Sequence, residues 1–298
     1  GAAPARRDHP VPRGEEERPM ERTVIVGGGH MGAVIARRLA HERPGTPVTV
    51  VEAASGRAAD LAGDRALTVV AAYAPEPGDL LVLAVPPTAL DRFAAELPAG
   101  ALHDVTVVSV MAGVRLETLE ARLGTARVLR AMPNLAAQVG RSMTLLCAGP
   151  GVGAGDVAAV QTELSAIGAV QLVLDESDLD AGTALAGSGP AFVAYVARAF
   201  TRFAAQEGFN DAAGLRLTCQ VLRGTADLLE ASGTDPERLY RQAATPGGTT
   251  AEGITCLEEH DLQAVVVEAL ERAAARSRRL AARPAGGPGD GRSPGRRP

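Results

Sequence analysis

Three glycines near the start of the chain have the spacing of a phosphate-binding turn. In the run Thr23-Val-Ile-Val-Gly-Gly-Gly-His-Met-Gly32, four residues typical of a strand precede the glycines. The first glycine would make a tight turn, the second would let backbone approach a pyrophosphate, and the third would let the next helix pack on the strand. That helix would offer unpaired N–H groups to the phosphates. The residues expected at the cofactor are Gly27, Gly29, His30, Met31 and Gly32. His30 could contact a phosphate or ribose, or lie in solvent.

Residues after the second predicted strand bear on which dinucleotide would bind. Glu52 lies 20 residues after Gly32 and could accept a hydrogen bond from the 2′-hydroxyl of the adenine ribose, which favours NADH. Ser55 and Arg57 follow closely, and an arginine could instead bind the 2′-phosphate of NADPH. The sequence therefore predicts NADH or NADPH as cofactor, with NADH favoured.

Two glycine-rich segments in the second half of the chain form another candidate site. Gly187-Ser188-Gly189-Pro190 is typical of a helix start, and its glycines would allow close approach by another chain or a ligand. Thr245-Pro-Gly-Gly-Thr-Thr250 combines a fixed turn with hydroxyls at the start of a helix, which Thr250 is suited to cap. A helix start with free hydroxyls could bind a carboxylate. A loop and helix cap without a ligand is the alternative interpretation.

Composition excludes several kinds of chemistry and partner. The chain has 298 residues, of which 46% are hydrophobic and 22% charged, so a globular protein is expected. All 30 basic residues are arginine, which excludes a Schiff-base lysine, a P-loop lysine and a lysine acid or base. The net charge of −5 and the absence of Trp disfavour a nucleic-acid partner.

Cysteines and hydropathy bear on the compartment. The three cysteines form no CxxC pair, so neither a disulfide framework nor a metal site is indicated. No apolar run reaches the about 18 residues of a membrane span, and no membrane partner is expected. We expect a reduced, cytoplasmic protein.

Short apolar runs alternate with helical stretches before about residue 176. Strands are expected at residues 23–27, 48–52, 67–71, 80–85, 105–110, 127–132, 143–147 and 170–174. Most are near-continuous apolar runs, as expected for strands buried on both faces. Helices alone follow, at residues 190–207, 211–231, 236–244, 250–259 and 262–282. The stretch 191–203 is apolar nearly all round, which indicates burial on several faces, as at a subunit interface.

This alternation predicts an α/β protein with two domains. A Rossmann-type dinucleotide-binding domain is expected at residues 20–176, followed by an all-helical dimerisation and substrate domain at 177–283. Residues 1–19 and 284–298 are rich in Pro, Gly, Arg or Glu without periodicity, so a disordered leader and tail are expected.

At these motifs the chain resembles the pyrroline-5-carboxylate reductase family, whose members make proline by reducing a cyclic imine. The resemblance covers about residues 20–283 and is most specific at 185–191 and at 245–253 with Leu257-Glu258. Supporting matches are Leu83-Ala84-Val85-x-Pro87, Ala112-Gly113-Val114 and Arg130-x-Met132-Pro133-Asn134.

The resemblance implies roles for individual residues. The nicotinamide side would be lined by Ala84, Val85, Pro87, Ala112 and Gly113, with Asn134 near the ribose or the ring. A small cyclic imino acid would be bound by Ser188, Thr245, Gly247, Gly248, Thr249 and Thr250, and Thr250 or a water could lie near the imine nitrogen as proton donor. The resemblance also implies an interlocked homodimer, in which a second subunit completes the pocket, and possible larger rings of dimers.

Several positions depart from the family pattern. Val85-Pro86-Pro87 stands where the family usually has Val-Lys-Pro, and Leu135-Ala136 stands where Thr-Pro is usual. Arg241 and Ala243 replace an Asp and a branched aliphatic residue, and Ala71 lies near a usual Asn. These changes bear on cofactor preference and on the identity of the imine.

Three other functions are therefore weighed against reduction of pyrroline-5-carboxylate. The same chemistry could act on a substituted pyrroline- or a piperideine-carboxylate in a specialised pathway. A β-hydroxyacid dehydrogenase shares the domain layout, but such enzymes typically need a catalytic lysine. A catalytically silent dinucleotide-binding regulator is the third.

Overall fold

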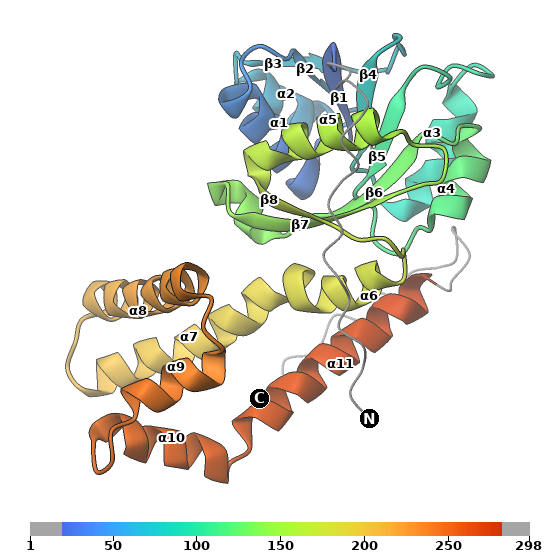
Figure 1. Cartoon of the computed structure of the whole chain (residues 1–298). Helices are drawn as coiled ribbons and strands as arrows, with labels where there is room; N and C mark the ends of the chain where they lie inside the picture. The colour runs from blue at the N-terminus through green and yellow to red at the C-terminus, as the bar shows by residue number, and fades with distance from the viewer. Residues whose placement is uncertain (1–19, 282–298) are drawn as a thin grey trace. The chain divides into compact units, whose positions relative to one another are not determined.

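The computed structural model describes residues 20–281, so the predicted leader and tail lie outside the described residues (Figure 1). The described chain divides into two compact units. The first holds residues 20–187 together with 274–281, and the second holds residues 188–273. The predicted domain bounds of 20–176 and 177–283 stay a prediction.

An eight-stranded sheet forms the centre of the first unit. Its strands are β1 (Arg22–Val26), β2 (Val48–Val51), β3 (Leu67–Val70), β4 (Asp79–Leu83), β5 (Thr106–Ser109), β6 (Val128–Met132), β7 (Ser142–Ala148) and β8 (Gly168–Leu172). Their order is β3-β2-β1-β4-β5-β6-β7-β8, and every neighbouring pair is parallel except β6 and β7. Each strand lies where the sequence predicts one, so the α/β prediction is confirmed.

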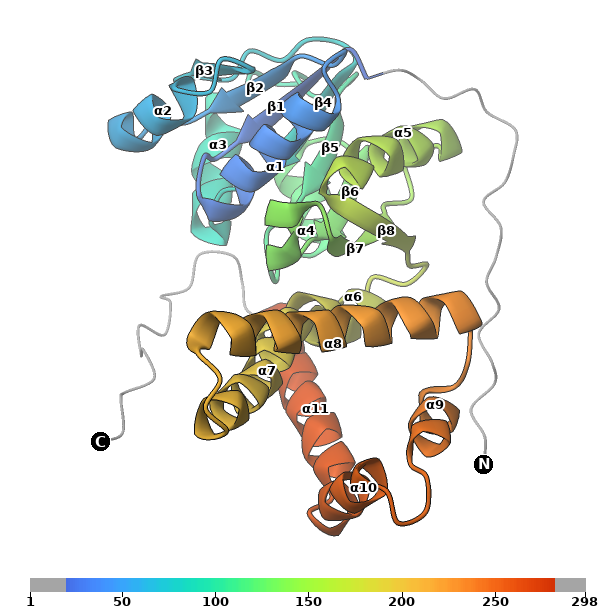
Figure 2. The ribbon, with the colours of Figure 1, turned by 90° about the vertical axis from the view of Figure 1, so that its left-hand side faces the viewer.

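Helices cover both faces of this sheet, which explains why most of its strands are apolar without alternation. The helices of the first unit are α1 (His30–Glu42), α2 (Ser55–Ala62), α3 (Leu90–Glu96), α4 (Leu116–Leu123), α5 (Ala154–Leu164) and α6 (Asp178–Gly182). Leu80 and Val82 of β4 point into a core shared with α1 and α5, whereas Leu81 and Leu83 point into a core shared with α3 and α4. Figure 2 shows α1 and α5 on one face and α3 on the other.

Strand order creates a crevice at one end of the sheet. β1 pairs with β2 on one side and with β4 on the other, so the order in which strands are added across the sheet reverses at β1. Ligands of open α/β sheets bind outside the carboxyl ends of the strands at such a switch point. The loops after β1, β2 and β4 are therefore the parts of the fold that position a site.

The second unit is made of helices, as predicted. These are α7 (Gly189–Gln206), α8 (Asp211–Ser232), α9 (Pro236–Ala243), α10 (Thr249–Glu259) and the larger part of α11 (Leu262–Ala281). The apolar helix α7 packs along α8, yet much of its surface is uncovered in the single chain. Tyr195 is 78% exposed and Phe203 is 63% exposed. The predicted burial on several faces therefore requires a partner.

A buried aspartate ties the amino-terminal ends of β1 and β4. Asp79, 1% exposed, accepts hydrogen bonds from Arg22 Nε at 2.9 Å and Nη2 at 2.7 Å, from Tyr73 Oη at 3.0 Å and from the Glu76 amide at 2.9 Å. Burial, with the Asp79 carboxylate beside it, raises the pKa of Tyr73, so the phenol stays a donor.

We expect Asp79→Ala to lower the free energy of unfolding by about 3 kcal/mol, because it leaves a partly buried arginine and a half-buried phenol without their acceptor. Urea unfolding followed by circular dichroism measures this. Asp104→Ala is the matched control, since that carboxylate is 61% exposed and should change stability by less than about 0.5 kcal/mol. Equal effects of the two substitutions would contradict the assigned role.

Candidate functional site

The glycine turn between β1 and α1 has the geometry that the sequence predicts. Gly27 has φ +103°, and a Cβ there would lie 2.8 Å from the Ala84 carbonyl oxygen at the end of β4. A Cβ on Gly32 would overlap the Gly27 carbonyl oxygen. A Cβ on Gly29, by contrast, would have no atom within 4 Å. Two positions therefore exclude a side chain because protein packs against them, and the third faces open space where a phosphate could approach.

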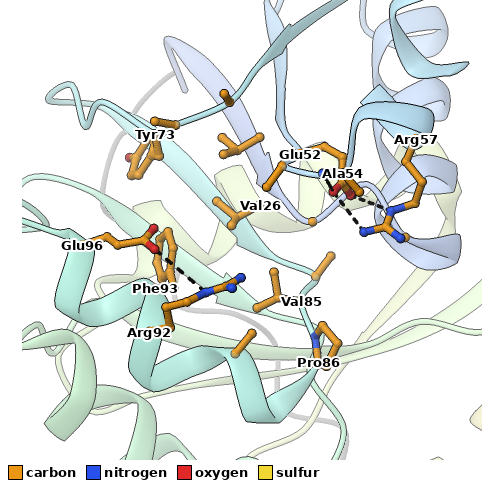
Figure 3. A pocket seen from close by; sticks show the side chains of 18 of the residues that line it. Val26, Glu52, Ala54, Arg57, Tyr73, Val85, Pro86, Arg92, Phe93 and Glu96 are labelled. Carbon is orange, nitrogen blue, oxygen red and sulfur yellow. Dashed lines mark hydrogen bonds and ion pairs between the residues drawn. The ribbon is translucent and has the colours of Figure 1, made fainter. Parts of the chain in front are cut away.

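A cavity of about 730 Å³ opens at this turn (Figure 3). It collects six residues predicted at the cofactor, namely Gly27, Gly29, Glu52, Arg57, Ala84 and Val85. The predicted Pro87 does not line it, but the adjacent Pro86 does.

Sequence reasoning missed the far wall of this cavity. Tyr73 and Phe93 stack with ring centroids 6.5 Å apart, and Arg92 and Leu97 lie beside them in the lining. Tyr73 belongs to the loop after β3 and Phe93 to α3. Only eight residues of the chain are aromatic, so a tyrosine just after the third strand and a phenylalanine in the helix after the fourth strand were the available signal.

The Glu52 carboxylate is fully engaged within the protein. One oxygen accepts from the Gly28 amide at 3.0 Å and from Arg57 Nε at 2.9 Å. The other accepts from the Ala54 amide at 2.7 Å and from Arg57 Nη2 at 3.0 Å. The Arg57 hydrogen bond lowers the pKa of Glu52 against the effect of burial, so the carboxylate stays charged. Glu52 thus joins the glycine turn to the start of α2, which is Ser55.

A second hollow, of about 460 Å³, lies on the other side of the turn. Its lining includes His30, Arg37, Arg57 and Gln138, and His30 Nε2 lies 3.0 Å from Gln138 Nε2. The His30 ring therefore lies on the side of α1 that faces this hollow. The Met31 side chain packs against the hydrophobic core, which leaves only its backbone to the phosphate turn.

Besides Pro87, three predicted nicotinamide residues do not line the large cavity. Ala112 is exposed, and Gly113, with φ +76°, faces the backbone of Leu280 in the last turn of α11. Asn134 is 6% exposed, and its amide donates to the Ala186 carbonyl at 2.9 Å while accepting from the Ala136 amide at 2.9 Å. The Asn134 side chain thus ties the backbone at Ala136 to the backbone at Ala186.

The predicted substrate turn lies in the second unit. The Gly248 amide donates to the Thr245 carbonyl at 2.9 Å, and Gly247 has φ +71°. The expectation that Thr250 caps the next helix is wrong: α10 begins at Thr249 after Gly248, and no side chain caps it. Glycine can take the cap position without a side chain, so Thr250 lies one residue inside the helix.

None of the three threonine side chains of this turn caps α10. Thr245, Thr249 and Thr250 are exposed, and their hydroxyls make no hydrogen bond to any part of the chain from residue 20 to 281. Together with the first amides of α10 they can bind a carboxylate.

Ser188 comes directly before α7, after a π-helical turn at Thr183–Gly187. Its carbonyl accepts from the Ala191 amide at 3.0 Å. Pro190 lies in the first turn of α7, as the sequence predicts.

Two absences within residues 20–281 bear on other functions. No cluster of three or more His, Cys, Asp or Glu side chains in that range could hold a metal ion. No helix in the same range has the length and apolarity to cross a membrane.

Comparisons with known proteins match both halves of the chain. A family model for pyrroline-5-carboxylate reductase dimerisation matches residues 176–280, and one for NADP oxidoreductase, coenzyme F420-dependent, matches residues 22–113. A pyrroline-5-carboxylate reductase from Synechocystis sp. is 33% identical over 260 residues, covering 86% of this chain and 97% of its own. One from Methanosarcina acetivorans is 38% identical over 204 residues, covering 68% and 75%.

A solved structure agrees with these sequence matches. The pyrroline-5-carboxylate reductase from Coxiella burnetii superposes with a TM-score of 0.79 at 27% identity, covering 88% of this chain and 98% of its own. The family resemblance first seen in the motifs is thereby confirmed, and the match extends over nearly the full length of the Synechocystis and Coxiella proteins. The chain belongs to the pyrroline-5-carboxylate reductase family.

Proposed function

We propose that this protein reduces 1-pyrroline-5-carboxylate to L-proline with a nicotinamide dinucleotide. The observation that carries the proposal is the glycine turn, with Gly29 open to a 730 Å³ cavity, in a chain that matches 97% of a curated relative's length. The bound dinucleotide would supply a hydride to the imine carbon, and a proton would be added to the nitrogen.

The protein's own part in this reaction is to bind and align. A cyclic imine is partly protonated near neutral pH and already electrophilic, so no lysine is needed to activate it. Thr245, Thr249 and Thr250 would hold the substrate carboxylate through hydroxyls and amides, and Ser188, Gly247 and Gly248 would shape the same pocket. Holding the dinucleotide and the imine in the reactive orientation can remove much of the entropic part of the activation barrier.

One observation favours a second candidate, the same reduction on a substituted pyrroline- or a piperideine-carboxylate. Leu135, an apolar residue where the family usually has a polar one, is 54% exposed and would suit extra carbon on the ring. The small Ala243 would also leave room for it.

The first test is oxidation of NADH and of NADPH at 340 nm with racemic 1-pyrroline-5-carboxylate. We expect turnover with a KM in the common enzyme range of about 1 μM to 1 mM. Cofactor binding without this turnover would move the assignment to the larger imines, to be assayed next. Cofactor binding without turnover on any of these imines would indicate a silent regulator.

Thr250 is proposed as the group near the imine nitrogen, directly or through a water. We expect Thr250→Ala to lower kcat by about 100-fold, the lower end for general acid catalysis, and Thr250→Ser to retain most of it. Steady-state kinetics with saturating cofactor measures both. If Thr250→Ala kept its kcat and raised only the KM for the imine, Thr250 would bind the carboxylate and have no part in proton transfer.

Preference for NADH over NADPH is proposed from the Glu52–Arg57 pair. A 2′-phosphate would lie near a buried carboxylate and compete with it for the Arg57 guanidinium. We expect Glu52→Gln to raise the NADPH-to-NADH ratio of kcat/KM by about ten-fold, because it removes the negative charge and releases Arg57.

Arg57→Ala is the matched variant, and it should lower kcat/KM for NADPH more than for NADH. A ratio that neither substitution changes would show that the pair has no part in selectivity.

A homodimer is supported by the dimerisation model at residues 176–280. The uncovered apolar side chains of α7 and α8, including Tyr195, Phe203 and Leu217, fit a subunit interface. Completion of the pocket by the second subunit, larger rings of dimers, and a cytoplasmic location stay predictions.

A further inference from the structure

A network of buried and half-buried charged side chains lies where the chain leaves the first unit and returns to it. Residues 178–187 lead to α7, and the end of α11 brings the chain back. Between them, Asp180 is only 4% exposed. One of its carboxylate oxygens accepts from Ser277 Oγ of α11 at 2.7 Å, and the other from Arg115 Nη2 at 3.0 Å.

Arg115 continues directly from the turn that holds Ala112 and Gly113. It is the N-cap residue of α4, and the next amide, that of Leu116, donates to Glu176 Oε1 at 2.7 Å. The same oxygen accepts from the buried Arg130 of β6 at 2.6 Å. The carboxyl-terminal side of the turn is therefore fixed to the segment that holds Glu176 and Asp180.

The turn itself packs against α11. A Cβ on Gly113 would lie 3.2 Å from the carbonyl carbon of Leu280, so only glycine allows this approach without displacement. Leu280 lies three residues after Ser277, within one helical turn. The Ser277–Asp180 hydrogen bond thus fixes the helical turn on which Gly113 rests.

We propose that Asp180 and Ser277 are positioning residues that hold the Ala112–Gly113 turn in place for the nicotinamide half of the cofactor. The inference rests on the proposed function and on the place beside the nicotinamide that the family resemblance implies for Ala112 and Gly113. Neither side chain touches the cofactor; each acts through Arg115 or through the last turn of α11.

The test compares two ligands on the full-length protein. The dinucleotide that the wild type binds more tightly is measured by calorimetry, together with the matching fragment without nicotinamide, ADP-ribose for NADH or 2′-phospho-ADP-ribose for NADPH. We expect Ser277→Ala to raise the Kd of the dinucleotide by about three- to ten-fold and that of the fragment by less than two-fold. Ser277→Thr keeps the hydroxyl and should restore dinucleotide binding.

Ser165→Ala is the matched control, because it also removes a serine hydroxyl whose hydrogen bond, to the Thr162 carbonyl, is 2.6 Å long. It should change neither Kd. Equal weakening of both ligands by Ser277→Ala, or no weakening of either, would overturn the positioning role alone. A wild type that binds neither dinucleotide would overturn the proposed function and this inference with it.

Discussion

Close contact between the glycine turn and the neighbouring strand is the constraint on which the site depends. Gly27 lies against the Ala84 carbonyl, and α1 passes so near the turn that Gly32 leaves no room for a side chain. This packing sets the start of α1 beside the end of β4 and leaves Gly29 facing the cavity. The open space for a pyrophosphate exists because its two flanking glycines are tightly packed.

Two buried carboxylates, each paired with an arginine, attach the surrounding loops to this turn and to the sheet. Glu52 joins the turn to the start of α2, and Asp79 joins the amino-terminal ends of β1 and β4. Arginine is the basic partner in both, in a chain without lysine. Its planar guanidinium can donate two parallel hydrogen bonds to one carboxylate, so each pair fixes orientation as well as charge. The chain's composition thus removes lysine chemistry but supplies groups well suited to holding loops.

The two candidate sites differ in how their polar groups are used. In the first unit the charged side chains that line the cavity already pair with one another, Glu52 with Arg57 and Glu96 with Arg92. Under the proposed function, a cofactor phosphate would have to compete with such a pair. In the second unit the hydroxyls of Thr245, Thr249 and Thr250 have no partner within the described chain. Free hydroxyls at a helix start are available to an incoming carboxylate without breaking an existing bond.

Local patterns in the sequence determined the elements and much of the candidate site. Apolar runs predicted all eight strands, because strands covered on both faces need no polar alternation, and the spacing of Gly27, Gly29 and Gly32 predicted the turn. Tertiary structure alone decided what the polar side chains bind. Glu52 bonds to Gly28 and Arg57, Asn134 bonds to Ala186, and Asp180 bonds to Ser277, which is 97 residues away. Arg57 is only five residues from Glu52, but Gly28, Ala186 and Ser277 come from segments that only the fold brings to their partners, so no local spacing encodes those bonds. The sequence predicted Thr250 as the cap of α10, but the N-cap residue is Gly248, whose amide is bonded to the Thr245 carbonyl. The backbone geometry of the turn, and not a threonine hydroxyl, therefore sets where the helix begins.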